Sequence, residues 1–485
     1  MSPDIAGLRQ RLHELGGACA DGELDPPLCP ATLNALFEHG LFSLTIPREC
    51  SGFDASLRDF ALCMEDIGVL GPAYSMTAVP HLCISVKSVA RAAPAQLRRD
   101  VLSAVRRDHR LLAFAITEDQ GSDVAAIRTR LAAASGGGLV LNGRKQWITN
   151  LRRASHVVVV ALCPEMHRAP SAAAFVLIPL DAPGVQVLPP QEKLIANGSD
   201  TANLHFDNVP VTSAQLLGEP GKALSYFAEL VLPGRVGTAA AALGIVQHAL
   251  KAVANDVSTP MQLTEIAELS ARLDTLRAAV TLAGALGDAN HGEFSHATAL
   301  VKHLGAMQCQ AVIGKLDRAY GDAGRDAPPA VQRARQSLGL FRLLKGPGEI
   351  IAYQAIVAMT ARLREPFTAP RDWPDDLAAH CVEFTRLACE LRGDRKLQSQ
   401  QLLLMGLADA AAALLAQLAL HMIDHSRPGG LTPAAQQHAR AWTSQLTASA
   451  LRELRELLHG NLLDRLDANY LQVRAVMHEL APHIY

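Results

Sequence analysis

The chain has 485 residues, of which 49% are hydrophobic and 19% are charged. This length and composition indicate a globular protein with a large core and exclude a mainly disordered chain. The net charge of −2 argues against nucleic acid as the main partner, because nucleic-acid-binding surfaces need an excess of basic residues.

The nine cysteines are scattered, and none shows the C-x-x-C or other spacing of a metal site. We therefore predict reduced thiols, no bound metal and a cytoplasmic location. The first 16 residues carry an acid at Asp4 and lack a long apolar run, which argues against a secretory signal.

Residues 1–110 are predicted to form an N-terminal helical domain. Apolar residues recur at helical spacing over 6–15 and 31–41. A loop with Pro47 and Gly52 follows the second of these helices.

Residues 111–220 are predicted to form a middle β domain. A glycine-rich turn at 135–138 joins two strands, and the Asn142-Gly143 pair is the strongest short signal for a further β-hairpin. The predicted strands are short, apolar and bounded by turn residues, and they cover 111–116, 128–134, 139–141, 157–161, 173–178, 185–188 and 202–206.

Two segments of this domain place small polar donors beside a tryptophan. Residues 117–123 read T-E-D-Q-G-S-D, and residues 143–150 read G-R-K-Q-W-I-T-N. A flat polar ring would fit there, with Trp147 covering one face and the hydroxyls of Thr117 and Thr149 donating to its heteroatoms. The alternative is a β-hairpin with an ordinary core tryptophan.

The two segments resemble those of the acyl-CoA dehydrogenase family of flavoproteins, which read T-E-P-x-A-G-S-D and G-x-K-x-W-I-T-N. A third segment, 192–201, resembles the family's K-M-G-x-R-G-S-x-T, with Asn197 in place of the basic residue. The resemblance implies an FAD ring between the β domain and a helical bundle. It also implies FAD contacts from Thr117, Trp147, Thr149, Ser199 and Thr201, and a substrate contact from Ser122.

Residues 221–366 are predicted to form a helical bundle whose first helix is rich in alanine and glycine, which permits close helix contacts. The resemblance implies that Arg235 of this helix lies near the flavin. The alternative is a surface arginine at the start of a helix.

The catalytic base of the family is usually a glutamate in a Y-E-G-T-x-E-I segment. Gly346, Glu349 and Ile350 match that segment here, but Lys345 stands at the position of the base. An ammonium group cannot accept a proton unless burial lowers its pKa by several units. Some relatives place the base one residue before the bundle arginine, and here that residue is Gly234. Glu349 is the main rival base, and a misplaced register is the remaining alternative.

The segments that hold the adenosine half of FAD in the family are incomplete. Residues 252–260 lack the arginine and phenylalanine of R-x-x-F-G, and Asp317 replaces the glutamine of Q-x-x-G-G-x-G. An aspartate near a pyrophosphate would repel it. We therefore predict weak FAD retention.

Residues 367–485 are predicted to form a C-terminal helical domain. The run 402–420 is long enough to span a bilayer, but Asp409 and many alanines favour a buried helix, so no membrane span is predicted. Residues 394–410 resemble the extra C-terminal domain of the very-long-chain acyl-CoA dehydrogenases, a subgroup of homodimers. The predicted fold is therefore mainly α with a central β domain.

Three functions follow from these observations. The first is a flavin-dependent oxidoreductase acting on an acyl thioester of CoA or acyl carrier protein, with altered or weak dehydrogenase chemistry. The second is a flavin-dependent monooxygenase of the same fold. The third is a non-redox thioester-binding enzyme, or a pseudoenzyme, that has lost FAD.

Overall fold

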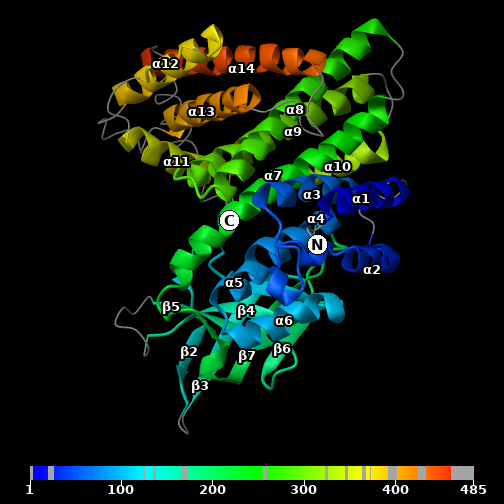
Figure 1. Cartoon of the computed structure of the whole chain (residues 1–485), viewed down its shortest axis with the longest axis vertical. Helices are drawn as coiled ribbons and strands as arrows, with labels where there is room; N and C mark the ends of the chain where they lie inside the picture. The colour runs from blue at the N-terminus through cyan, green and yellow to red at the C-terminus, as the bar shows by residue number, and fades with distance from the viewer. Residues whose placement is uncertain are drawn as a thin grey trace, which may run out of the picture. The chain divides into compact units, whose positions relative to one another are not determined.

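The computed structural model describes residues 4–19, 27–121, 123, 126–134, 138–164, 172–193, 195–254, 259–322, 326–343, 348–362, 367–371, 373–391, 401–422 and 433–459. The chain divides into two compact units, Met1–Pro347 and Gly348–Tyr485. The first contains helices and a central β sheet, and the second is helical (Figure 1). The predicted mainly helical fold with a central β domain is confirmed. The division into four domains at 110, 220 and 366 stays a prediction.

The N-terminal region is helical, as predicted. Its helices are α1 (Ile5–Cys19), α2 (Pro30–Glu38), η1 (Leu41–Ser43), η2 (Arg48–Cys50), α3 (Leu57–Leu70), α4 (Pro72–Pro80), η3 (His81–Ser85), α5 (Val86–Ala92) and α6 (Ala95–Arg107). The short η3 segment is a π-helix that follows Pro80, and π-helical turns are often found at functional sites.

A buried histidine joins these helices to the sheet. The backbone N–H of Leu112 donates to His81 Nδ1 at 3.0 Å, so the proton of the neutral ring lies on Nε2, which donates to the Phe42 carbonyl at 2.9 Å. Burial lowers the pKa of His81 to about 4, against the hydrogen bonds to Phe42 and Leu112 that raise it. The ring is therefore neutral at physiological pH.

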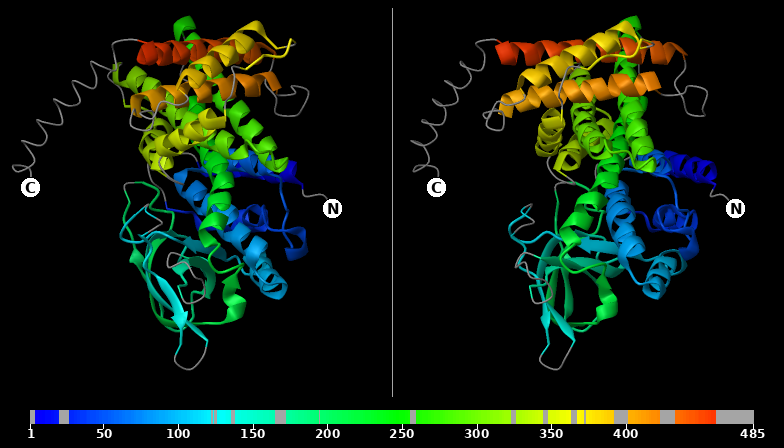
Figure 2. Two further views of the ribbon diagram at one scale, coloured as in Figure 1. Left: turned by 90° about the vertical axis from the view of Figure 1, so that its left-hand side faces the viewer. Right: turned by 60° about the vertical axis from the view of Figure 1, so that its left-hand side comes forward.

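The central sheet is mixed. Its strands are β1 (Leu111–Ala115), β2 (Arg130–Ala133), β3 (Leu139–Thr149), β4 (Ala154–Leu162), β5 (Ala173–Pro179), β6 (Val185–Pro190), β7 (Thr201–Val211) and β8 (Leu216–Leu217). They are ordered β6-β7-β3-β2-β4-β5-β8, and β1 pairs in parallel with β4. One face buries an apolar cluster that includes Leu131, Val159 and Phe206. Figure 2 shows the strands gathered at one end of this unit.

The hairpin predicted at Asn142-Gly143 is wrong. Strands β2 and β3 do form an antiparallel pair, but the chain reverses earlier, where Ala134 N donates to the Gly138 carbonyl at 3.1 Å. Asn142 and Gly143 lie inside β3, at an irregularity in its pairing with β7. Gly143 has a φ of +148°, and a Cβ there would lie 2.5 Å from Thr129 Oγ1. The Asn-Gly pair therefore serves a β-bulge rather than a turn.

The bundle helices of the first unit follow the sheet. They are α7 (Ala223–Ala254), α8 (Pro260–Asp288), α9 (Phe294–Asp322) and α10 (Pro329–Leu343). Helix α7 packs on β5 near its start and on α8 and α9 further along. Where α7 crosses α3, a Cβ at Gly244 would lie 1.9 Å from the Glu65 carbonyl, and one at Gly68 would lie 2.3 Å from the Ala241 carbonyl. The prediction that small residues permit close helix contacts is confirmed.

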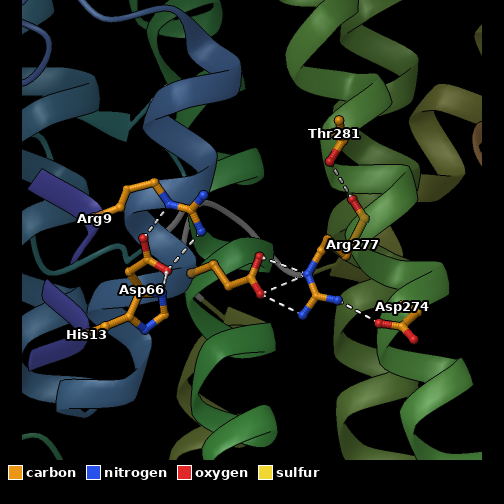
Figure 3. A network of polar contacts seen from close by, with 7 residues as sticks. Arg9, His13, Asp66, Asp274, Arg277 and Thr281 are labelled. Carbon is orange, nitrogen blue, oxygen red and sulfur yellow. Dashed lines mark hydrogen bonds and ion pairs between the residues drawn. The ribbon is translucent and has the colours of Figure 1, made fainter. Parts of the chain in front are cut away.

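Two ion pairs tie α3 to its neighbours (Figure 3). Arg9 Nε of α1 donates to Asp66 Oδ2 at 2.6 Å, and Arg277 Nη2 of α8 donates to Glu65 Oε1 at 2.8 Å. Both carboxylates are buried. Arg277 also donates to Asp274 at 2.6 Å, so its charge is fully compensated.

The second unit consists of α11 (Gly348–Arg362), α12 (Asp375–Leu391), α13 (Gln401–Met422) and α14 (Pro433–His459). Helix α13 packs against the other three. Two helical stretches of the chain, Ala223–Ala254 and Leu404–Met422, are long and apolar enough to cross a membrane, but 78% and 72% of their apolar windows are buried within the protein. Such burial is typical of core helices.

Candidate cofactor site

Hydrogen bonds place the two motif segments side by side. Gln146 N donates to the Thr117 carbonyl at 2.9 Å, and the Gln146 side-chain amide donates to Asp119 Oδ1. Thr117 follows the end of β1, and Gln146 lies near the end of β3. The ends of these two strands therefore form one continuous polar surface.

A buried ion pair lies directly behind this surface. Lys145 is fully buried and Glu118 is 6% exposed, and Lys145 Nζ lies 2.7 Å from Glu118 Oε1. Lys145 Nζ also donates to the Ile116 carbonyl at 3.1 Å. Glu118 accepts from the backbone N–H groups of Arg128, at 2.7 Å, and Thr129, at 3.1 Å. One carboxylate thus fixes three stretches of chain.

Both members of this pair are ionised at neutral pH. Burial raises the pKa of Glu118, but the hydrogen bonds from Lys145, Thr129 and Arg128 outweigh burial and bring the pKa below its ordinary value. Burial lowers the pKa of Lys145 to about 8, and the contact with Glu118 keeps it from falling further.

Trp147 sits on a bulge that turns its ring outwards. The pairing of β3 with β7 is irregular between Lys145 and Ile148, and Trp147 has a φ of +57°. Its backbone N–H donates to Asn203 Oδ1 at 3.1 Å rather than to the sheet ladder. The side chain is 52% exposed, so the alternative of an ordinary core tryptophan is wrong. A bulge of this kind re-aims a side chain and is common beside active sites.

The third predicted segment lies next to the second. Thr149 pairs with Thr201 across β3 and β7. Lys193 Nζ donates to the Ser199 carbonyl at 2.7 Å and to Thr201 Oγ1 at 3.2 Å. Asn197 bonds both backbone groups of Lys193, at 2.8 Å and 2.7 Å. Lys193 therefore supplies a cation to the turn in which Asn197 replaces the family's basic residue.

Arg235 lies inside α7, well after its first residue Ala223, and it is half-buried. The alternative of a surface arginine at a helix start is therefore wrong. Its Nε is buried and has no hydrogen-bond partner among the residues that the structure describes, and burial lowers the pKa of the guanidinium to about 10. Two helical turns earlier, Phe227 stacks on Phe114 of β1 with ring centroids 5.5 Å apart, so α7 packs on the strand that leads to Thr117.

The side chains of three predicted site residues lie outside the described part of the structure. Ser122 and Lys345 lie outside the described residues. Glu349 lies on α11, in the second compact unit, and its side chain is likewise outside the described part.

The residues of the site fit a flat polar ring. Trp147 offers an exposed aromatic face. Thr149 lies two residues further along the same strand, the Thr117 carbonyl accepts from the preceding residue Gln146, and both threonines are half-buried. Within the described part of the chain, the Ser199 hydroxyl and Arg235 Nε are buried without a hydrogen-bond partner. Buried polar atoms without partners are rare in folded proteins, and a bound polar group would satisfy them.

The expected repulsion at Asp317 needs revision. Asp317 of α9 accepts from Arg335 Nη1 of α10 at 3.0 Å, so a cation already compensates its charge. The stretch 255–258, which was expected to lack a pyrophosphate contact, lies outside the described residues.

Sequence reasoning missed four residues that shape this site. Glu118 and Lys145 were present in the motif segments, and Lys193 and Asn203 in or near the third segment, but none had been given a role. A signal that could have suggested the first pair is the charge of the two segments, since the first carries three acids and the second carries Arg144 and Lys145.

Comparisons with known sequences agree with the motif segments. Residues 113–209 match the family model described as acyl-CoA dehydrogenase, middle domain. The chain is 25% identical over 331 residues to a probable acyl-CoA dehydrogenase, YngJ, of Bacillus subtilis, covering 66% of this chain and 87% of the relative. It is 28% identical over 338 residues to the mitochondrial very long-chain specific acyl-CoA dehydrogenase of Macaca fascicularis, covering 66% of this chain and 52% of that relative.

The fold is also that of a solved acyl-CoA dehydrogenase. The structure of the Bacillus anthracis enzyme complexed with FAD superimposes with a TM-score of 0.78 at 19% identity, covering 94% of this chain and 87% of that one. At this identity the likeness establishes the fold alone.

Proposed function

We propose that this chain, which belongs to the acyl-CoA dehydrogenase family, is a flavoprotein that acts on an acyl thioester carried by CoA or by acyl carrier protein. The observation that supports this function best is the exposed Trp147 on its bulge, beside Thr117 and Thr149. A large aromatic ring held outwards at a cost in backbone strain needs a reason, and a stacked cofactor ring supplies one.

The residues of the site would bind the flavin and the thioester in the following way. Trp147 covers one face of the flavin ring, and Thr117, Thr149, Ser199 and Thr201 donate to its polar edge. Ser122 contacts the thioester. These residues would hold a flavin, which would supply the hydride-accepting chemistry for the β carbon of the acyl group.

The altered chemistry concerns the proton on the α carbon. Its removal needs a free base, and Lys345 cannot serve as one in its ammonium form. A cation there would instead stabilise an enolate or bind a carboxylate of the substrate. Arg235, whose buried Nε has no hydrogen-bond partner among the described residues, adds a second positive group on α7. We therefore expect very low turnover of straight-chain saturated acyl thioesters.

The proposal includes the very-long-chain-like subgroup and a cytoplasmic homodimer. The subgroup and the dimer rest on the likeness of residues 394–410 to that subgroup's additional helical domain and on the relative from Macaca fascicularis, and the location rests on the scattered cysteines. Gel filtration with light scattering tests the dimer.

Two experiments test the function. The visible spectrum of the protein titrated with FAD should show a perturbed flavin band; a spectrum identical to free FAD would favour the non-redox alternative. Dye reduction over a panel of acyl-CoA chain lengths should then be low in the wild type and appear in Lys345→Glu. Robust wild-type turnover that vanishes in Glu349→Gln would show that Glu349 is the base.

A further inference from the structure

A cavity of about 820 Å³ opens on the β domain, beyond the turn that follows the second motif segment. Its walls come from the α6–β1 connection, the β3–β4 turn, the start of β4, the residues after β5, and β6. Cavities of 300–1,000 Å³ are typical of small-molecule sites. None of the residues assigned to the flavin ring lines this cavity.

One side of the cavity is cationic. Arg110 and Arg152 line it, both are exposed, and within the described chain neither guanidinium has a hydrogen bond or ion pair. Asp181 is the carboxylate among the lining residues, so the formal charge favours an anion. The Arg152 backbone N–H donates to Asp200 Oδ2, which fixes the position of this residue independently of its side chain.

Neutral donors lie between the two arginines and the strands. Ser155 Oγ and His156 Nδ1 are 3.1 Å apart, at the start of β4. Burial lowers the pKa of His156, although Asp181 raises it, so this ring is uncharged at neutral pH. The cationic character of the cavity thus comes from the arginines.

The other side is apolar. Val187 and Leu188 are 38% and 40% exposed, and Leu180 is half-buried beside them. These residues lie on or near β6, a strand at the edge of the sheet, which ends in Pro189 and Pro190. Prolines have no N–H to donate, so this edge is a poor template for an added strand. The exposed side chains therefore suit a ligand better than a pairing peptide.

We propose that this cavity binds an anionic amphiphile, with a carboxylate or phosphate head on Arg110 and Arg152 and an apolar chain along Leu180, Val187 and Leu188. The planar fork of N–H donors on an arginine matches the oxygens of a carboxylate or phosphate, and burial of the apolar chain supplies the remaining affinity. The site is independent of the proposed flavin site, because the two share no residue.

Isothermal titration with decanoate, well below its micelle-forming concentration, tests this site on the full chain. Decanoate and decyl phosphate should bind with saturation, while decanol and inorganic phosphate bind roughly tenfold more weakly or not at all. Decanoate and decyl phosphate distinguish a carboxylate from a phosphate head.

Three variants locate the ligand. The double change Arg110→Gln with Arg152→Gln should weaken decanoate by roughly tenfold or more but leave decanol unchanged. Leu188→Ser should weaken both amphiphiles. Arg106→Gln, at an exposed arginine of α6 outside the cavity, should leave binding unchanged.

Decanoate affinity that survives the double arginine change would overturn the proposal and point to the acyl site instead. Equal affinity for decanol, or binding seen only with micelles or lipid vesicles, would overturn it as well. These outcomes do not depend on flavin, so they are separable from failure of the proposed function.

Discussion

Removing one member of the Lys145–Glu118 pair should be among the most damaging single changes in the β domain. Lys145 is fully buried, Glu118 is 6% exposed, and their charged atoms are 2.7 Å apart. Lys145→Met leaves a buried carboxylate without its cation, which typically costs about 3–5 kcal/mol of unfolding free energy. The double change with Glu118→Gln leaves no charge and keeps one of the two acceptor oxygens that the N–H groups of Arg128 and Thr129 use. The double variant should therefore be more stable than Lys145→Met alone, by about 1–3 kcal/mol.

Urea unfolding of the four members of this cycle gives the coupling energy, and an FAD titration of each gives the effect on the site. Because the pair fixes the segments that carry Thr117 and Trp147, Lys145→Met should also weaken flavin binding. Arg277→Met is the matched control: it breaks a partly buried ion pair between α8 and Glu65 of α3 (Figure 3) and should destabilise the fold without affecting flavin.

Two results would refute this reasoning. If Lys145→Met unfolds within about 0.5 kcal/mol of the wild type, as a surface change would, the pair is not buried in solution. If Arg277→Met weakens flavin binding as much as Lys145→Met does, the loss reports general instability and not the position of the motif segments.

Three further predictions follow from single residues. The pKa of His81 falls from 6.5 to about 4 on folding, so between these pH values only the unfolded chain binds the proton. The contribution of His81 to the unfolding free energy should therefore be complete above pH 6.5 and fall by about 3 kcal/mol as the pH is lowered to 4. Urea unfolding should show this pH dependence in the wild type and not in His81→Gln. Gly244→Ala should lower the unfolding free energy by about 1–3 kcal/mol, because the added Cβ would meet the Glu65 carbonyl. Gly314→Ala in α9, where a Cβ would meet nothing within 4 Å, should be neutral or slightly stabilising. Equal urea midpoints for the two variants would contradict the close crossing of α3 and α7. Trp147→Ala should weaken FAD binding and shift the spectrum of the bound flavin, but leave the stability of the flavin-free protein nearly unchanged, because the side chain is exposed. Trp147→Phe should bind FAD with an affinity between those of the wild type and Trp147→Ala. An FAD titration that is the same in all three proteins would remove Trp147 from the site.

The strands and helices could be predicted because the order of apolar and polar residues along each element agrees with the side that it buries in the core. The strand 111–116 and the helix 31–41 appear as β1 and α2, where a short apolar run and helical spacing predicted them. The Asn142-Gly143 pair misled because its turn preference is local, whereas β3 continues past it to pair with β7 on both sides. Tertiary pairing outweighed a short-range signal, and the glycine was needed for the bulge beside Thr129.

The site was only partly predictable, for a different reason. Trp147 and Thr149 were identified through motif letters, which report residue types at a spacing. Burial of Lys145 was not predictable, because lysine is almost always solvated and no local pattern marks the exception. That burial depends on Glu118, which lies in another segment and becomes a neighbour only when β1 and β3 come together.

The same geometry bears on where a catalytic base can come from. A carboxylate removes a proton only if a lone pair faces the substrate. Both oxygens of Glu118 accept from Lys145, Arg128 or Thr129, so this acid of the first motif is already engaged, and Asp119 accepts from Gln146 at Oδ1. A proton acceptor for the α carbon must then be sought elsewhere, and the stretch around Lys345 and Glu349 is where the resemblance puts it. Activity created by Lys345→Glu, and unaffected by Asp119→Asn, would fit this argument; activity lost in Asp119→Asn would return the base to the first motif.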